Sequence, residues 1–331
     1  MLKKIRPDTF TLLLLACVGL ATFLPCQGTV ATGFSWATKA AITLLFFMHG
    51  AKLTREAVLG GLGAWRLHLA VGASTFILFP LLGMAIAALP DQLLDDDLKG
   101  GFLFLSILPS TVQSSIAFTS IAGGNIAAAV CSASLSNIAG VFLTPLLAGM
   151  LIPGAGEAHG GTLEAIGSVA TTLLLPFAVG HFSRPLTGRF VDRHKSLLGR
   201  LDRGSILLVV YTAFSAAVVE GLWSRISIAD LVAIALTGSL LLLVVLGVTR
   251  WAGRLWFRRE DEIVLVFCGS KKSLASGVPM AAALFPAAQV GFLILPLMIF
   301  HQIQLILCAF IARSYAQQNS APQEATAEGA A

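Results

Sequence analysis

Residues 260–284, EDEIVLVFCGSKKSLASGVPMAAAL, contain the feature that decides the fold. An apolar run ends at Gly269, a polar cluster with two lysines follows, and a second apolar run begins at Leu274. As a helix, the run from Glu260 to Gly269 spans about 15 Å, which is half of a bilayer core of about 30 Å. The pattern predicts a membrane-spanning helix that is broken near the bilayer midplane.

Lys271 and Lys272 are the charges inside this break. A lysine at the centre of a membrane helix costs about 2.5–3.5 kcal/mol on the insertion scale. We therefore interpret the pair as functional: one or both lysines hold an anionic substrate or stand in for a bound cation. The alternative is structural, with the lysines neutralising carbonyl groups that the break leaves unpaired. Ser270 and Ser273 flank the pair and are further candidate binding residues.

The rest of the chain predicts that this helix belongs to a polytopic all-α membrane protein. The chain has 331 residues, of which 56% are hydrophobic and only 12% charged, about half the charged fraction of a soluble domain. No Asp, Glu, Lys or Arg occurs over residues 100–156 or 273–312. These runs exclude a soluble globular enzyme and a disordered chain. The apolar runs predict ten membrane spans: 8–25, 37–51, 67–89, 100–122, 125–152, 161–183, 204–222, 228–249, 260–284 and 288–311.

The basic residues predict the orientation of these spans. If the N-terminus is cytoplasmic, 17 of the 22 Lys and Arg residues fall in cytoplasmic segments and 3 on the opposite side, as the positive-inside rule expects. We therefore place both termini in the cytoplasm and the protein in the cell (inner) membrane. The net charge of +5 then reflects contact with anionic lipid headgroups, and we expect no nucleic-acid partner.

Ten spans divide into two halves of five, 1–152 and 153–315, followed by a tail over 316–331 that we expect to be disordered. An odd number of spans inverts one half relative to the other, which is a common transporter design. Pro109 breaks span four much as Gly269 breaks span nine. Freed carbonyls attract cations and the N-termini of half-helices attract anions, so two crossing breaks predict a substrate site. The candidate residues at the first break are Gln113, Ser114 and Ser115.

Polar residues in spans five and ten are weaker candidates. Asn137 is predicted to line the site, whereas Ser136 could equally pack between helices. His301 and Gln304 could form interhelical hydrogen bonds, and His301 is also a candidate proton relay. Within the predicted membrane spans, the sequence contains no nucleophile–base pair and no cluster of metal-ligating residues. We therefore expect neither an enzyme nor a metal site.

Taken in order, three motifs resemble the bile acid:sodium symporter superfamily, and the resemblance covers about residues 5–315. The motifs are LPSTVQSS at 108–115, GNIA at 124–127 and GSKKS at 269–273. The chain looks closest to the branch of the seventh member of human solute carrier family 10 and its bacterial relatives. The resemblance implies an inverted repeat of ten helices with panel and core domains. Spans four and nine would cross at their breaks inside the core domain.

The resemblance also implies sodium-coupled uptake of organic anions by alternating access, but the sodium ligands differ. Sodium-coupled members use a Ser-Asn pair, hydroxyls of span five, a Glu and a Gln-Asn pair. The matching positions here are Ser114 and Ser115, Ala129 and Ala133, Phe267, and Lys271 and Lys272. The carboxylate and the amides are missing, so a lysine ammonium in the cation's place would make transport sodium-independent or proton-linked.

We therefore expect a secondary active transporter of a small organic anion, without a cofactor and with sodium or a proton as the coupling ion. The alternative function is a non-transporting membrane regulator of calcium homeostasis, which the resemblance to the human protein makes credible.

Overall fold

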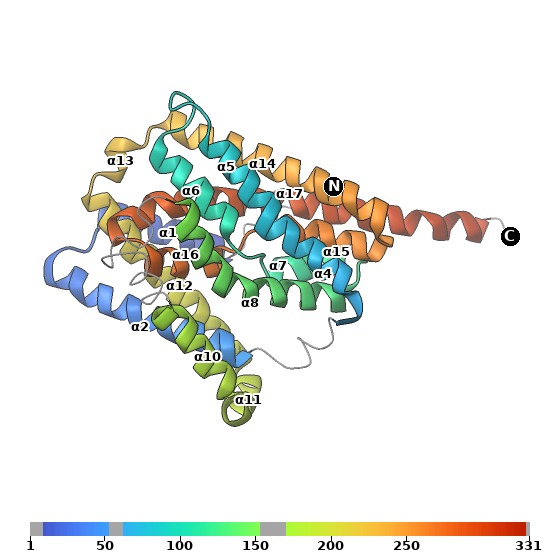
Figure 1. Ribbon diagram of the computed structural model, residues 1–331, viewed down its shortest axis with the longest axis horizontal. Coiled ribbons are helices and arrows are strands. Elements are labelled where there is room, and N and C mark those ends of the chain that lie inside the picture. Colours follow the sequence, from blue (N-terminus) through green and yellow to red (C-terminus); the bar gives the residue numbers. More distant parts are fainter. Residues whose placement is uncertain (1–8, 53–61, 153–169, 329–331) are drawn as a thin grey trace.

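The computed structural model describes residues 9–52, 62–152 and 170–328, and these residues form helices and loops without a strand (Figure 1). Six helical stretches in this part are long and apolar enough to cross a membrane. They are Gly28–Lys52, Trp65–Ala87, Ile126–Leu151, Ser196–Val219, Ile228–Trp256 and Ala287–Gln318. The chain is therefore an all-helical, multi-pass membrane protein, while the ten-span count and the inverted repeat stay predictions.

Several helices extend beyond the spans that we expected. Helix α2 (Gly28–Lys52) begins nine residues earlier than predicted, and α12 (Lys195–Val219) also begins earlier. Helix α17 (Ala287–Glu328) continues through most of the tail that we expected to be disordered. Ala, Gln and Glu dominate that tail and are good helix formers, so its composition suits a helix as well. Of the 17 basic residues that we place in cytoplasmic segments, Lys3, Lys4, Arg6 and Arg55 lie outside the described residues. So do the start of the predicted span 161–183 and the residues that follow the predicted boundary at 152–153.

Both predicted breaks are present. Helix α6 (Asp96–Ile107) ends before Pro109, and α7 (Gln113–Ile121) follows the break. Helix α15 (Arg259–Gly269) ends before the two lysines, and α16 (Leu274–Leu284) follows them. Acidic residues occupy the first turns of α6 and α15, where they complement the positive end of the helix dipole.

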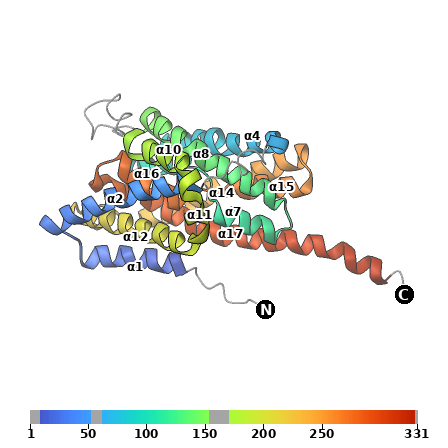
Figure 2. The same ribbon diagram turned by 90° about the horizontal axis from the view of Figure 1, so that it is seen from below.

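A first group of helices consists of α1 (Thr9–Phe23), α2, α10 (Leu175–Phe182) and α12. Figure 2 shows α1, α12 and α2 side by side, and α10 packs along α2. Two glycines make the contact between α2 and α10 close: a Cβ on Gly50 would collide with the carbonyl oxygen of Phe177, and one on Gly180 with that of Phe47. Small residues at such crossings let two membrane helices approach backbone to backbone.

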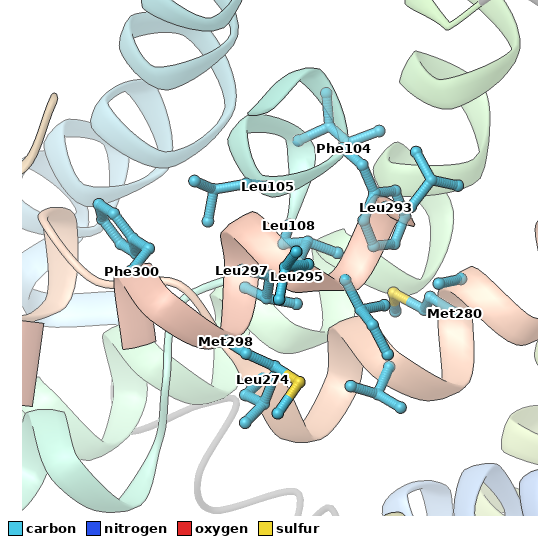
Figure 3. Packing of buried hydrophobic residues seen from close by; sticks show 14 of the residues in the cluster. Phe104, Leu105, Leu108, Leu274, Met280, Leu293, Leu295, Leu297, Met298 and Phe300 are labelled. Atoms are coloured by element: carbon cyan, nitrogen blue, oxygen red, sulfur yellow. The ribbon is translucent and has the colours of Figure 1, made fainter. Parts of the chain in front are cut away.

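A second group surrounds α17 and contains both broken helices. Helices α6, α14 (Ile228–Trp256) and α16 pack against α17, and Figure 3 shows Leu108 of the first break next to Leu297 of α17. Gly277 of α16 gives both leucines room, because a Cβ there would lie 2.7 Å from a methyl carbon of Leu297. The remaining elements are η1 (Leu62–Ala64), α4 (Trp65–Ala73), η2 (Ser74–Leu78), α5 (Phe79–Ala87), α8 (Ile126–Leu151), η4 (Ala170–Leu174), α11 (Arg184–Arg193) and α13 (Leu222–Arg225).

Candidate functional site

The carbonyl groups around the break after α6 find donors on other elements. Thr144 of α8 donates its hydroxyl to the carbonyl of Ile107 at 2.8 Å. Asn137, also on α8, donates its amide to the carbonyl of Ser110 at 2.9 Å. The backbone N–H of Ser273, in the other break, donates to the carbonyl of Pro109 at 2.9 Å. Lipid could not satisfy these groups, so the break depends on the helices that surround it.

The end of α15 is satisfied in the same way by side chains from elsewhere. Ser115 of α7 donates to the carbonyl of Phe267 at 2.9 Å, and Ser110 donates to that of Cys268 at 2.6 Å. The next carbonyl, that of Gly269, accepts the hydroxyl of Ser74 at 2.8 Å. Two of these donors come from the first break, so the two breaks hold each other's main chain and form one structural unit.

Lys272 places its side chain between the two broken helices and η2. Its Nζ donates to the carbonyls of Thr75, Ser106 and Leu108 at 2.8, 2.7 and 2.7 Å. The Nζ also lies 4.1 Å from the ring centroid of Phe79, and the side chain is fully buried. These contacts are the ones expected if the lysine neutralises carbonyl groups that the breaks leave unpaired, which is the structural alternative given above.

Proline chemistry explains why the Thr75 carbonyl is free. Residues Ser74–Leu78 form one turn of π-helix, and the N–H of Phe79 donates to the carbonyl of Ser74 instead of that of Thr75. The next residue is Pro80, which has no N–H to offer. The Thr75 carbonyl is therefore left without its usual donor along its own helix.

The Ser106 carbonyl loses its helical donors for a similar reason. Pro109 has no N–H, and the N–H of Ser110 donates to the hydroxyl of Ser136 at 3.0 Å. The Leu108 carbonyl lies beyond the last helical residue of α6, Ile107. Lys272 therefore serves three acceptors that the local chain geometry has left open.

Gln304 of α17 holds the main chain of the same lysine. Its Oε1 accepts the N–H of Lys272 at 2.9 Å, and its Nε2 donates to the carbonyl of Lys272 at 2.9 Å. The Nε2 also lies 2.8 Å from Nδ1 of His301. Since the amide nitrogen can only donate, Nδ1 accepts and the imidazole hydrogen is on Nε2. The break is thereby linked to His301.

Lys271 has different surroundings from its neighbour. Its side chain is also fully buried, but its Nζ has no hydrogen-bond acceptor among the described residues. The Nζ lies 4.4 Å from the ring centroid of Phe118 and 5.5 Å from that of Phe267. Aromatic faces attract a cation but do not replace a carbonyl or a carboxylate. The ammonium of Lys271 is therefore only partly compensated.

A cavity of about 580 Å³ lies between the two helix groups. The N-termini of α7 and α16 both border it, through residues 112–114 and 273–275. Its other polar lining residues are Thr111, Ser134, Asn137, Ser276 and His301 on one side, and His49, Lys52, Asp202 and Arg203 on the other. Lys52 and Asp202 form an ion pair, and Arg203 lies over the ring of Phe10.

The predicted binding residues separate into two sets. Gln113, Ser114, Asn137 and Ser273 line the cavity. Ser115, Ser270, Lys271 and Lys272 are buried outside its lining. The lysines lie outside the cavity lining because Lys272 extends toward η2 and α6, while Lys271 extends toward aromatic rings of α7 and α15. Any direct contact of the lysines with an anion in this cavity would need the site to rearrange.

Three further residues belong to this unit although we did not predict them: Ser74, Thr75 and Thr144. For Thr75, one signal was in the sequence. Pro80 lies inside the expected span 67–89, and an interior proline leaves a carbonyl of the preceding turn without a donor. Ser74 and Thr144 act through their hydroxyls and have no such signal, because a serine or threonine in a membrane helix usually bonds to its own helix.

Two interrupted helices whose breaks bond to each other beside a polar cavity are typical of one class of protein, the helical membrane transporters. The chain belongs to the SBF-like CPA transporter family, whose family model matches residues 8–317. It is 53% identical over 327 residues to "Putative symporter YfeH" of Escherichia coli, with 98% of each chain covered. An uncharacterised protein of Pseudomonas aeruginosa is equally similar, at 53% over 326 residues and 98% of each chain. Sodium/bile acid cotransporter 7 of Rattus norvegicus is 24% identical over 317 residues, covering 93% of this chain and 92% of the relative.

Proposed function

We propose that the protein is a secondary active transporter that moves a small organic anion across the cell membrane by alternating access. The observation that supports this substrate class is the position of two half-helix N-termini, those of α7 and α16, on one cavity. Helix N-termini carry partial positive charge and unpaired N–H groups, and both favour an anion. The apolar walls, with Phe46, Ile138 and Phe177 among them, suit a carbon skeleton attached to that anionic group.

The cationic side chains of the cavity favour the same substrate class. Lys52 is paired with Asp202, while Arg203 contacts an aromatic ring. One carboxylate thus faces two cationic side chains in the lining, which leaves an excess of positive charge. Alternating access would move the two helix groups relative to each other. In this proposal each group contains helices from both inverted halves, 1–152 and 153–315, and both termini lie in the cytoplasm.

We infer that transport is linked to protons and not to sodium. The contacts of Lys272 support this, because an ammonium already fills the carbonyl site where the two breaks meet. Lys271 supports it from the other side, because a buried amine without a hydrogen-bond acceptor is a group that can exchange a proton during a transport cycle. The name of the rat relative mentions sodium and bile acid; we propose only the organic anion for this chain.

Counterflow in proteoliposomes tests the transport activity without a coupling gradient. Vesicles are loaded with one member of a panel of monocarboxylates, dicarboxylates, sulfonates and sulfate esters, and the radiolabelled compound is added outside. We expect at least one anion to exchange, and we expect Gln113→Ala to slow that exchange because its side chain faces the cavity. Gln289→Ala, an exposed glutamine at the start of α17, is the matched control. Absence of exchange across the whole panel would contradict the proposal.

A further inference from the structure

Lys272 fills a site with the chemistry of a cation-binding site. Three main-chain carbonyl oxygens from two separate elements, η2 and the end of α6, converge on one point at 2.7–2.8 Å. Sets of carbonyl oxygens are what proteins use to replace the hydration shell of a monovalent metal ion. None of the three belongs to the chain segment that carries Lys272, so all three acceptors are supplied by other parts of the chain.

The ammonium matches this site in number and charge. A lysine ammonium has three N–H donors and no acceptor, and each donor has one carbonyl. The ring of Phe79, 4.1 Å from Nζ, adds a cation–π contact. No neutral side chain offers three hydrogen-bond donors from a single atom.

The ammonium is also fixed in place. Gln304 bonds both the N–H and the carbonyl of Lys272, at 2.9 Å each, so the backbone is clamped where the side chain begins. The side chain is fully buried. A bound ion can dissociate into water, whereas this cation is covalently attached to the chain between α15 and α16. Gln304 holds its backbone and three carbonyls hold its ammonium.

We propose that Lys272 is a tethered cation in a monovalent-cation site, and that the crossing of the two broken helices is held together by this ammonium in place of a free ion. The inference refines the proton-linked transport proposed above, since a permanently filled site leaves no place there for a sodium ion. It concerns the assembly of the crossing, however, and can be tested without any transport substrate.

Chemical rescue tests the proposal most directly. Lys272→Ala removes the three methylene groups and the ammonium beyond Cβ, which together correspond to one molecule of propylammonium. The variant is solubilised in detergent with propylammonium chloride present throughout, and thermal unfolding is followed by intrinsic fluorescence. Above the dissociation constant, we expect the Tm of the variant to rise by roughly 2–4 °C for each tenfold increase in propylammonium. Sodium and potassium chloride form separate arms, and either ion could also fill the vacated site.

Four controls separate binding in the vacated site from general effects. Wild-type protein and Lys271→Ala should show no rise, because the ammonium of Lys272 is still in place. Lys272→Met should be destabilised and not rescued, because its apolar side chain fills the same space. 1-Propanol has the shape of propylammonium without its charge and should give no comparable rise. A Lys272→Ala variant that propylammonium, sodium and potassium all fail to stabilise overturns the proposal.

The wild-type protein gives a second measurement that does not depend on a variant that folds. Its Tm should be the same in sodium, potassium and choline chloride at equal ionic strength. A specific rise in sodium would overturn the proposal, because the crossing would then use a free ion. Neither measurement involves a transported organic anion. If the Lys272→Ala variant is rescued as expected but the wild-type protein exchanges no organic anion, only the proposed transport function is contradicted.

Discussion

Replacing each of the two adjacent lysines by methionine should have different effects on stability. Methionine has a similar length and suits an apolar interior, so both changes keep the volume and remove the ammonium. Lys272→Met leaves the carbonyls of Thr75, Ser106 and Leu108 without the donor that they have now. Lys271→Met removes an ammonium that has no hydrogen-bond acceptor among the described residues.

The magnitudes follow from these contacts. A buried acceptor left unsatisfied costs about 1–3 kcal/mol, so Lys272→Met should lower the free energy of unfolding by about 3 kcal/mol or more. At roughly 2–4 °C per kcal/mol, its Tm should fall by roughly 6 °C at least. Lys271→Met loses cation–π contacts worth up to about 2 kcal/mol but removes a buried charge whose desolvation costs several kcal/mol. Its Tm should therefore be unchanged or higher.

The assay is thermal unfolding of the three purified proteins in one detergent, followed by intrinsic fluorescence. Wild type and both variants are measured side by side at the same pH and salt concentration. A Lys271→Met variant that loses as much stability as Lys272→Met would refute the reasoning, because the two lysines would then carry equivalent structural contacts.

Two other predictions concern the contacts that hold the helices. Gln304→Leu leaves the N–H and the carbonyl of Lys272 unpaired. We expect the free energy of unfolding, measured by heat or denaturant, to fall by about 2–6 kcal/mol. A fall of less than about 1 kcal/mol would show that these two hydrogen bonds are dispensable. Gly50→Ala should lower the Tm because its Cβ would collide with the carbonyl oxygen of Phe177 and force α2 away from α10. Gly19→Ala in α1 has open space around its Cβ, and an equal fall in that control would contradict the explanation.

The breaks could be predicted from the sequence because each has a local chemical cause. Pro109 ends a helix whatever surrounds it, and a Gly-Ser-Lys-Lys-Ser cluster is too polar to continue an apolar membrane helix. The helix ends were less predictable. Helix α2 begins at Gly28, inside a stretch that we assigned to a loop, since length and hydropathy mark the centre of a span better than its ends.

The directions of the two lysines could not be predicted. They are adjacent in a non-helical segment, so no periodicity assigns them to a face. Lys272 is directed by the free carbonyl of Thr75, almost two hundred residues away in the chain, and that carbonyl is free because of Pro80. Both the cavity and this carbonyl site depend on contacts between distant segments, which the sequence of either segment alone does not contain.

Uptake of an anion under imposed ion gradients is the most direct test of the account's central claim, transport that needs no sodium. Proteoliposomes containing an anion identified by counterflow are given a pH gradient in sodium-free medium, and separately a sodium gradient at constant pH. We predict accumulation that follows the pH gradient, is unaffected by sodium, and is lost in Lys271→Met although that variant folds. Accumulation that requires the sodium gradient and ignores the pH gradient would contradict the account.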